Sequence, residues 1–222
     1  MFMWSHKRKA ISTVLVTMII LVASVVLATG VVLYGTSLSQ SKATSETIST
    51  TGTQMWLDSS GGSGWAWGAA AVRNAGDKIL SVDQILIRGQ TIPFANWYAD
   101  TNASQVTVIN FQSALVYTSM KTPLNSPDGQ LTNGTDFNVA WTAPGGCTLG
   151  TGNLILKLTS TNPTLCLSQR NGPLSLAPGD RAIIYFKTPH NLLTSVDAST
   201  PVTISIYAGK AGSPVEVTAQ SK

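Results

Sequence analysis

The chain is poor in histidine, and this shortage removes whole classes of chemistry. It has two histidines, His6 and His190, and His6 stands beside a basic cluster at the N-terminus. A His-rich metal site or a blue-copper site needs at least two histidines, so these are excluded, and a catalytic triad would have to use His190. His190 follows Pro189 in a segment typical of an exposed loop. We therefore expect no enzyme activity, no metal and no cofactor.

Charge is also scarce, since charged residues make up 11% of the sequence. The net charge of +4 depends on the cluster Lys7-Arg8-Lys9, because without it 11 of the 14 basic residues remain against 10 acidic ones. A nucleic-acid-binding protein should show a basic patch or stripe, and none remains beyond the cluster. We expect no nucleic-acid partner.

Cysteine is limited to Cys147 and Cys166, which is consistent with one disulfide in an oxidising compartment or with two buried thiols. A disulfide would close a loop of roughly 20 residues and stabilise the fold by about 3 kcal/mol. Two sequons, at Asn102 and Asn133, lie in turn-like segments and are candidate N-glycosylation sites. Abundant Ser, Thr, Gly and Asn also suit an exported protein.

The longest stretch without charge begins directly after the basic cluster. It runs from Ile11 to Tyr34, and no cation follows until Lys42. As a helix, these 24 residues would extend about 36 Å, enough to cross a bilayer core of about 30 Å. The preceding cations predict a cytoplasmic N-terminus and an exported C-terminal part.

The junction between the cations and the apolar run resembles the leader of archaeal type IV pilin-like proteins, including archaellins. The resemblance covers residues 7 to about 40 and maps the processing site onto Lys9, Ala10 and Ile11, with Ile11 as the new N-terminus. Bacterial pilins carry Glu at the fifth mature position, and this chain has Leu15 there, which favours the archaeal branch.

The resemblance implies a filament subunit, cut by a prepilin peptidase and assembled with copies of itself by a membrane platform and its ATPase. Filament and cell surface would then be its final location, after an initial stay in the membrane. Motility filament and adhesive pilus remain equally open. Two alternatives are an uncleaved anchor carrying a binding or stator domain, and an ordinary signal peptide cut after Ala28.

Small side chains recur along the apolar run at spacings of four and seven and would form one stripe on a helix. Such a stripe allows a neighbouring helix to approach closely. The stripe consists of Thr13, Thr17, Ser24, Ala28 and Gly35.

The sequence predicts four parts: a class III (prepilin-type) leader at 1–10, a transmembrane and filament-core helix at 11–36, a polar stalk at 37–53, and an extracellular domain at 54–222. The domain consists of short β runs separated by turns, and residues 71–89 resemble a hairpin with Asn74 at its bend. We expect an α+β chain: one long helix, then an all-β antiparallel sandwich of immunoglobulin-like type. The expected strands are Met55–Leu57, Trp65–Arg73, Ser81–Arg88, Val106–Phe111, Phe137–Thr142, Leu154–Leu158, Asp180–Lys187, Pro201–Ala208 and Val215–Ala219.

Two weaker site candidates lie within this domain. Asn125, Asp128, Asn133 and Asp136 could supply oxygen ligands to Ca²⁺, although they lack an Asp-x-Asp-x-Asp spacing. Aromatic residues are numerous and could form the core, a subunit interface or a sugar-binding platform. They are Trp56, Trp65, Trp67, Trp97, Tyr98 and Trp141.

Overall fold

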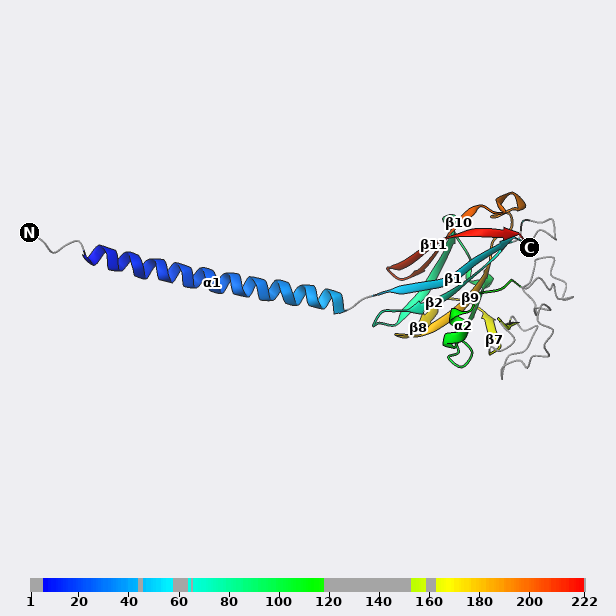
Figure 1. Cartoon of the computed structure of the whole chain (residues 1–222), viewed down its shortest axis with the longest axis horizontal. Helices are drawn as coiled ribbons and strands as arrows, with labels where there is room; N and C mark the ends of the chain where they lie inside the picture. The colour runs from blue at the N-terminus through cyan, green and yellow to red at the C-terminus, as the bar shows by residue number, and fades with distance from the viewer. Residues whose placement is uncertain are drawn as a thin grey trace, which may run out of the picture. The chain divides into compact units, whose positions relative to one another are not determined.

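A computed structural model describes residues 6–43, 46–57, 64, 66–117, 153–158 and 163–221, with side chains in the first range described for 13–38. The chain divides into two compact units at Ser45/Glu46. The first unit contains a long helix and the second, here called the β-domain, contains the strands (Figure 1). The expected α+β organisation is confirmed at this level.

Helix α1 spans His6–Ala43, 38 residues without a proline or an internal break. At 1.5 Å per residue it is about 57 Å long. Its sequence combines Leu, Ala and Met, which favour helix, with many β-branched residues whose side chains are stiff in a helix. The predicted apolar helix is therefore confirmed, and it extends beyond the expected 11–36 at both ends.

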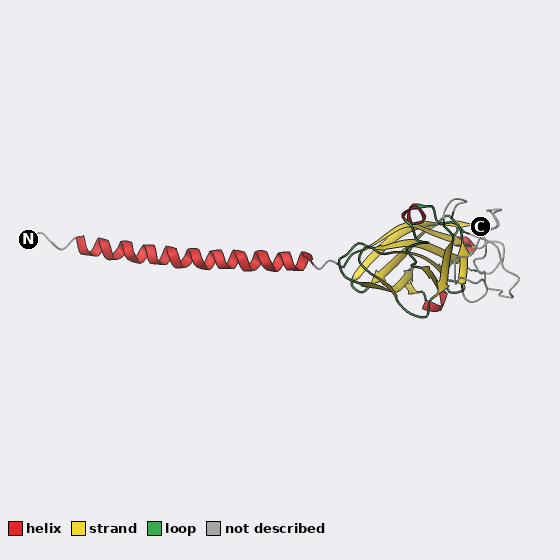
Figure 2. Ribbon diagram, turned by 90° about the horizontal axis from the view of Figure 1, so that it is seen from below, coloured by secondary structure: helices red, strands yellow, loops and turns green. Residues whose placement is uncertain are grey.

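Among the described residues the β-domain has eleven strands, two 3₁₀ turns and one short helix (Figure 2). The strands are β1 (Ile48–Leu57), β2 (Ala66–Asn74), β3 (Leu80–Ile87), β4 (Gln90–Thr91), β5 (Trp97–Asp100), β6 (Asn153–Leu156), β7 (Leu165–Gln169), β8 (Leu174–Leu176), β9 (Arg181–Lys187), β10 (Pro201–Ala208) and β11 (Ala211–Ser221). The other elements are η1 (Phe94–Asn96), α2 (Val108–Gln112) and η2 (Ser195–Asp197). Strand β1 begins at Ile48, so residues 48–53 of the expected stalk belong to the β-domain.

The strands join in the order β4-β3-β10-β11-β1-β2-β9-β5-β7-β6, with β8 paired to β3. All described pairings are antiparallel except one, because β11 runs parallel to β1 with Met55 opposite Ala219. The expectation of a wholly antiparallel arrangement is therefore wrong, and the sheet is mixed. The C-terminal hairpin of β10 and β11 is as expected.

Strands β2 and β9 are buried on both faces, because alternate residues enter two different core clusters. On β9, Ile184 and Phe186 belong to the first cluster, whereas Ile183 and Tyr185 belong to the second. The first cluster also takes side chains from β3, β8 and β10. The second is covered by segment 106–117. Apolar burial on both faces explains why these two strands read as nearly continuous apolar runs.

Residues 106–111 form no strand, although the β-branched run around Val108 predicted one. The Thr107 side chain accepts a hydrogen bond from the Asn110 N–H (3.3 Å), which caps α2. The buried Asn110 amide donates to Gln105 O (2.6 Å) and Pro163 O (2.9 Å). These polar contacts hold the segment in a helical turn against local β propensity.

The expected hairpin at 71–89 is also wrong, because β2 and β3 do not pair with each other. After the buried Asn74 at the end of β2, the chain instead crosses to β3, which pairs with β10, β4 and β8. The Asn74 amide donates to Lys78 O (2.6 Å) and Leu176 O (2.9 Å), and its side-chain oxygen accepts the Gly76 N–H (2.9 Å). We call residues 75–79 the arch.

The strand registers define two ends of the β-domain. The proximal end contains Glu46, where the chain enters, and the arch lies there because Ala75 N–H donates to Thr47 O (2.9 Å). The distal end contains Leu57 and the segment between β9 and β10, since β9 ends at Lys187, opposite Trp67 at the start of β2. Turn 88–89 lies at the distal end too, because Arg88 N–H donates to Thr203 O (3.2 Å) near the start of β10.

Candidate functional site

The surface of α1 is the largest apolar feature of the described chain. Between Thr13 and Leu38, 26 residues form a helix long and apolar enough to cross a membrane, and none of its side chains is buried within the unit. A membrane span and a signal sequence share both properties. Because apolar side chains surround the helix rather than one face, it requires an apolar environment on every side.

The hydroxyl groups of this helix bond to their own backbone. Thr17 Oγ1 donates to Val14 O (2.9 Å) and Ser24 Oγ to Leu21 O (2.8 Å). Thr29 and Thr36 make equivalent bonds to carbonyls three or four residues earlier. An unpaired hydroxyl in an apolar medium costs several kcal/mol, and these four avoid that cost without a partner helix.

The predicted stripe residues all lie on α1 and occupy one side of it. With 3.6 residues per turn, Thr13, Thr17, Ser24, Ala28 and Gly35 fall within a sector roughly 60° wide. No heavy atom lies within 4 Å of the position that a Cβ would take at Gly35. A close approach of a second helix at this side is therefore sterically open.

A second small-residue row was missed in the sequence. Ala23, Gly30 and Ser37 recur at intervals of seven and point to a different side of α1, roughly 130° from the first stripe. The interval of seven would have revealed them. Two rows on different sides fit contact with more than one neighbouring helix.

The predicted processing-site residues Lys9, Ala10 and Ile11 lie within α1, and their side chains are outside the described part. Cleavage between Ala10 and Ile11 stays a prediction. So does the pairing of Cys147 with Cys166, because Cys166 lies on β7 but Cys147 is outside the described residues.

Of the two sequons, Asn102 is described and Asn133 is not. Asn102 is exposed on a turn, and its side-chain oxygen accepts the Ser104 N–H (3.0 Å). Its position is accessible to a modifying enzyme, and glycosylation stays a prediction. The preceding Asp100 is buried, and its carboxylate accepts the N–H groups of Asn102 (2.9 Å) and Cys166 (2.8 Å). Burial raises the pKa of Asp100, and these two hydrogen bonds partly oppose that rise.

The burial of the described tryptophans assigns them to the core rather than to a sugar-binding platform. Trp56, Trp67 and Trp97 are each at most 2% exposed and belong to the core clusters, so they form no surface platform for sugars. Trp56 stacks on Tyr185 (6.2 Å between ring centres), whose hydroxyl donates to Val116 O (3.0 Å). Tyr98 is partly buried and packs against the second cluster, while Trp65 and Trp141 lie outside the described residues.

The structure places the candidate catalytic histidine but not the candidate calcium ligands. His190 is exposed in the segment between β9 and η2. Within the described residues no group of three or more His, Cys, Asp or Glu could hold a metal ion. The Ca²⁺ candidates Asn125, Asp128, Asn133 and Asp136 lie outside those residues.

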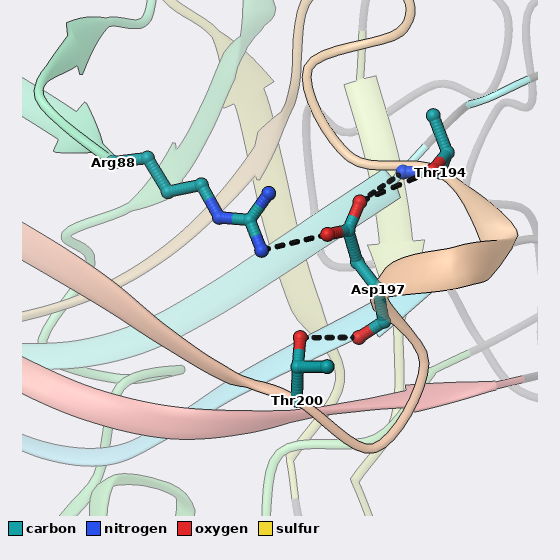
Figure 3. Close-up of polar contacts among 4 residues, drawn as sticks. All are labelled: Arg88, Thr194, Asp197 and Thr200. Carbon is teal, nitrogen blue, oxygen red and sulfur yellow. Dashed lines mark hydrogen bonds and ion pairs between the residues drawn. The ribbon is translucent and has the colours of Figure 1, made fainter.

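A polar cluster at the distal end joins two segments that are distant in sequence (Figure 3). Arg88 donates to Asp197 Oδ1 (2.7 Å), and the other carboxylate oxygen accepts the Thr194 N–H (2.8 Å) and hydroxyl (3.2 Å). Thr200 Oγ1 donates to Asp197 O (2.6 Å). Hydrogen bonds to the carboxylate hold the pKa of Asp197 below its usual range. The bond from the Thr194 N–H has the largest effect, and the bond from Arg88 has the next largest.

Asp197→Asn should therefore remove a pH-dependent part of the stability. A carboxyl whose folded pKa is lowered stabilises fully above its unfolded value of about 3.9, and this contribution is lost as pH falls through the folded pKa. The urea midpoints of wild type and variant should differ at about pH 6 and converge towards about pH 2. Asp100, whose raised pKa acts in the opposite direction, is common to both proteins and cancels in the difference. Arg88→Gln should keep a weaker pH dependence, because the Thr194 bond remains; a constant difference across this range would contradict the assignment.

No protein-family model matches the sequence, and no match was found among curated proteins. The structure establishes a chain with a long apolar N-terminal helix followed by a mixed, mostly antiparallel β-sheet domain. Any assignment of function therefore depends on the physical properties of the helix and of the domain.

Proposed function

We propose that this chain is the structural subunit of an archaeal extracellular filament, a type IV-like pilus or archaellum. The observation that carries the proposal is α1, in which Thr13–Leu38 form a helix long and apolar enough to cross a membrane and are not buried within the unit. The cation-to-apolar junction at Lys9-Ala10-Ile11 supports a pilin-like leader that is removed at the start of the apolar run.

Assembly would exchange one apolar environment for another. The subunit waits in the membrane with α1 in lipid, and extraction brings α1 into a bundle with copies of itself. Burial of apolar surface contributes about 25 cal/mol per Å², so a helix of this length strongly favours the bundle over water. Four hydroxyl groups would stay bonded to carbonyls of their own helix in both environments, so the transfer would break none of these hydrogen bonds. They belong to Thr17, Ser24, Thr29 and Thr36.

The remaining partners follow from this proposal. A prepilin peptidase would remove residues 1–10, and a membrane platform with a separate ATPase would supply the work of extraction. The cations in the first turns of α1 would keep the N-terminus in the cytoplasm and place the β-domain outside the cell.

The β-domain would form the outer surface of the filament as an immunoglobulin-like sandwich. The first core cluster supports this finer assignment, because it joins Val82 and Ile204 from β3 and β10 to Ile184 and Phe186 from β9. In a sandwich, two layers of strands bury their inner faces against a common core. Here the two layers would be the part of the sheet with β3 and β10 and the part with β9. The parallel β1–β11 pair connects these two parts.

Mass spectrometry of the N-terminus tests the filament proposal. Sheared filaments should contain this chain beginning at Ile11, because the leader must be removed before the helix can enter the bundle. Ala10→Phe should block removal and leave the intact chain in the membrane, whereas Ala10→Gly, which keeps a small residue, should not.

The alternative function predicts the opposite distribution. A membrane-anchored binding or stator protein would keep its N-terminus and remain in the membrane fraction of wild-type cells. Absence of the chain from filaments, or a product that begins after Tyr34, would contradict the filament proposal.

A further inference from the structure

Two arginines lie next to each other where β2 and β9 reach the proximal end of the β-domain. Arg73 on β2 and Arg181 on β9 are directly opposite each other in the strand register. Residues paired in this way point to the same face of the sheet, with Cβ atoms about 5 Å apart. Among the described residues the one ion pair joins Arg88 to Asp197, so neither Arg73 nor Arg181 is neutralised there by a carboxylate.

The rest of this face is apolar, which makes the pair of charges unusual. Arg73 is the exposed residue of β2, whose other side chains are all buried. The next residues on the same face, Ala71 of β2 and Ile183 of β9, belong to the second core cluster. Like charges directly opposite each other on neighbouring strands destabilise a sheet. The two arginines therefore carry a cost that the described part of the domain does not offset.

The surroundings of the pair add further hydrogen-bond donors. The guanidinium carbon of Arg181 lies 5.9 Å from the ring centre of Phe111, which packs against the second cluster. On the other side of Arg73, Ser49 of β1 is its partner in the register. A hydroxyl and two guanidinium groups thus form a row across β1, β2 and β9, which lie side by side (Figure 1). Guanidinium groups bind phosphate and carboxylate oxygens through pairs of parallel hydrogen bonds, so this row suits an oxyanion.

The place of the row along the chain favours a phosphate at the membrane surface. The apolar segment of α1 ends at Leu38, and the row begins at Ser49. The chain between them is helical as far as Ala43 and can extend at most about 30 Å. Lipid headgroups occupy roughly 5–7 Å beyond the hydrocarbon core on each side. A tether this short keeps the row within reach of the headgroups.

We propose that Arg73 and Arg181 bind the phosphate group of an anionic lipid while the subunit is held in the membrane. This proposal rests on the membrane stage of the proposed function, which the anchored alternative shares. The negative charge of the lipid offsets the repulsion between the two guanidinium groups, so bound lipid stabilises the β-domain.

Thermal unfolding of the full-length chain in non-ionic detergent micelles tests the site. Adding phosphatidylglycerol should raise the Tm of the β-domain by about 3 °C or more, because a ligand that binds only the folded state stabilises it. Zwitterionic phosphatidylcholine should have little effect. Arg73→Gln, which keeps the contact between Arg181 and Phe111, should abolish the rise. Without anionic lipid this variant should unfold at or above the wild-type Tm, because the repulsion is removed.

Lys78→Gln/Lys210→Gln is the matched control, because it removes two exposed charges from the arch and from the β10–β11 turn and leaves both arginines. It should keep the full rise with phosphatidylglycerol. Loss of the rise in this control would mean general charge attraction and would overturn the site, as would an Arg73→Gln variant that is less stable than wild type without lipid. An equal rise with inorganic phosphate alone would overturn the lipid assignment.

The outcomes for the site and for the proposed function can be told apart. No rise in the wild-type Tm with phosphatidylglycerol would overturn the lipid site and leave the filament function intact, since that function is tested by the N-terminus found in sheared filaments. A wild-type chain that never enters the membrane would instead overturn the proposed function.

Discussion

Val25→Lys should remove the chain from both the membrane and the filament. Val25 lies near the middle of Thr13–Leu38, where a lysine changes the apparent insertion free energy by about 3 kcal/mol relative to valine. This difference corresponds to more than a hundredfold in an equilibrium constant. In a filament bundle the same ammonium group would be buried without a partner. The substitution is therefore unfavourable both in lipid and in the bundle.

The measurement is the amount of chain in membrane and sheared-filament fractions, with Ser37→Lys as the matched control. Position 37 lies near the end of the apolar segment, where a lysine side chain can extend its charge to the aqueous interface. We expect Ser37→Lys to insert into the membrane at near wild-type level, and this control applies to the membrane fraction because Ser37 belongs to the second small-residue row. Filaments that contain Val25→Lys at the wild-type level would show that α1 is not packed in an apolar environment.

The helix could be predicted from the sequence because its signal is local. An uncharged run from Ile11 to Tyr34 cannot remain in water, and its length matches a bilayer. Its ends could not be predicted, since polar residues on either side continue the helix to His6 and Ala43 without an apolar pattern. The small-residue stripe could be read in the same way, because helical periodicity alone places it.

Strands were predictable where apolar and polar residues alternate or a turn marks the start. Arg181–Lys187 and Pro201–Ala208 lie close to their expected bounds. Short strands such as Trp97–Asp100 and Leu174–Leu176 were missed because three or four residues carry no pattern of their own. Pairing partners were not predictable either, since β1 and β11 come from opposite ends of the β-domain sequence.

The polar cluster around Asp197 at the distal end was also only partly predictable from the sequence. The Thr194–Asp197 spacing is a capping signal that could have been read from the sequence. Its link to Arg88, 109 residues earlier, depends on the chain's path through the sheet and leaves no local trace. The exposure of Val196 and Ile79 could not be predicted either, because valine and isoleucine are residue types that usually lie in the core.

Gly68→Ala should be the most damaging small substitution in the β-domain. Gly68 lies opposite Phe186 in the β2–β9 register, and a Cβ at position 68 would overlap the ring carbons of Phe186. Phe186 is fully buried in the first core cluster, so its ring has no space into which it can move. Overpacking of this kind costs about 1–3 kcal/mol and sometimes more.

A matched glycine on β11 separates ring overlap from the general effect of replacing glycine in a strand. Gly212 lies opposite Tyr207, and a Cβ there would approach the Tyr207 ring to 2.6 Å, but this ring is only partly buried and can turn towards solvent. In thermal unfolding we expect Gly68→Ala to lower Tm by about 5 °C or more. Gly212→Ala should change Tm by less than about 2 °C. Phe186→Leu should partly rescue Gly68→Ala, because it removes the overlapping ring atoms. Equal Tm values for the two alanine variants would mean that Phe186 does not fix position 68, and the close β2–β9 packing would then need another cause.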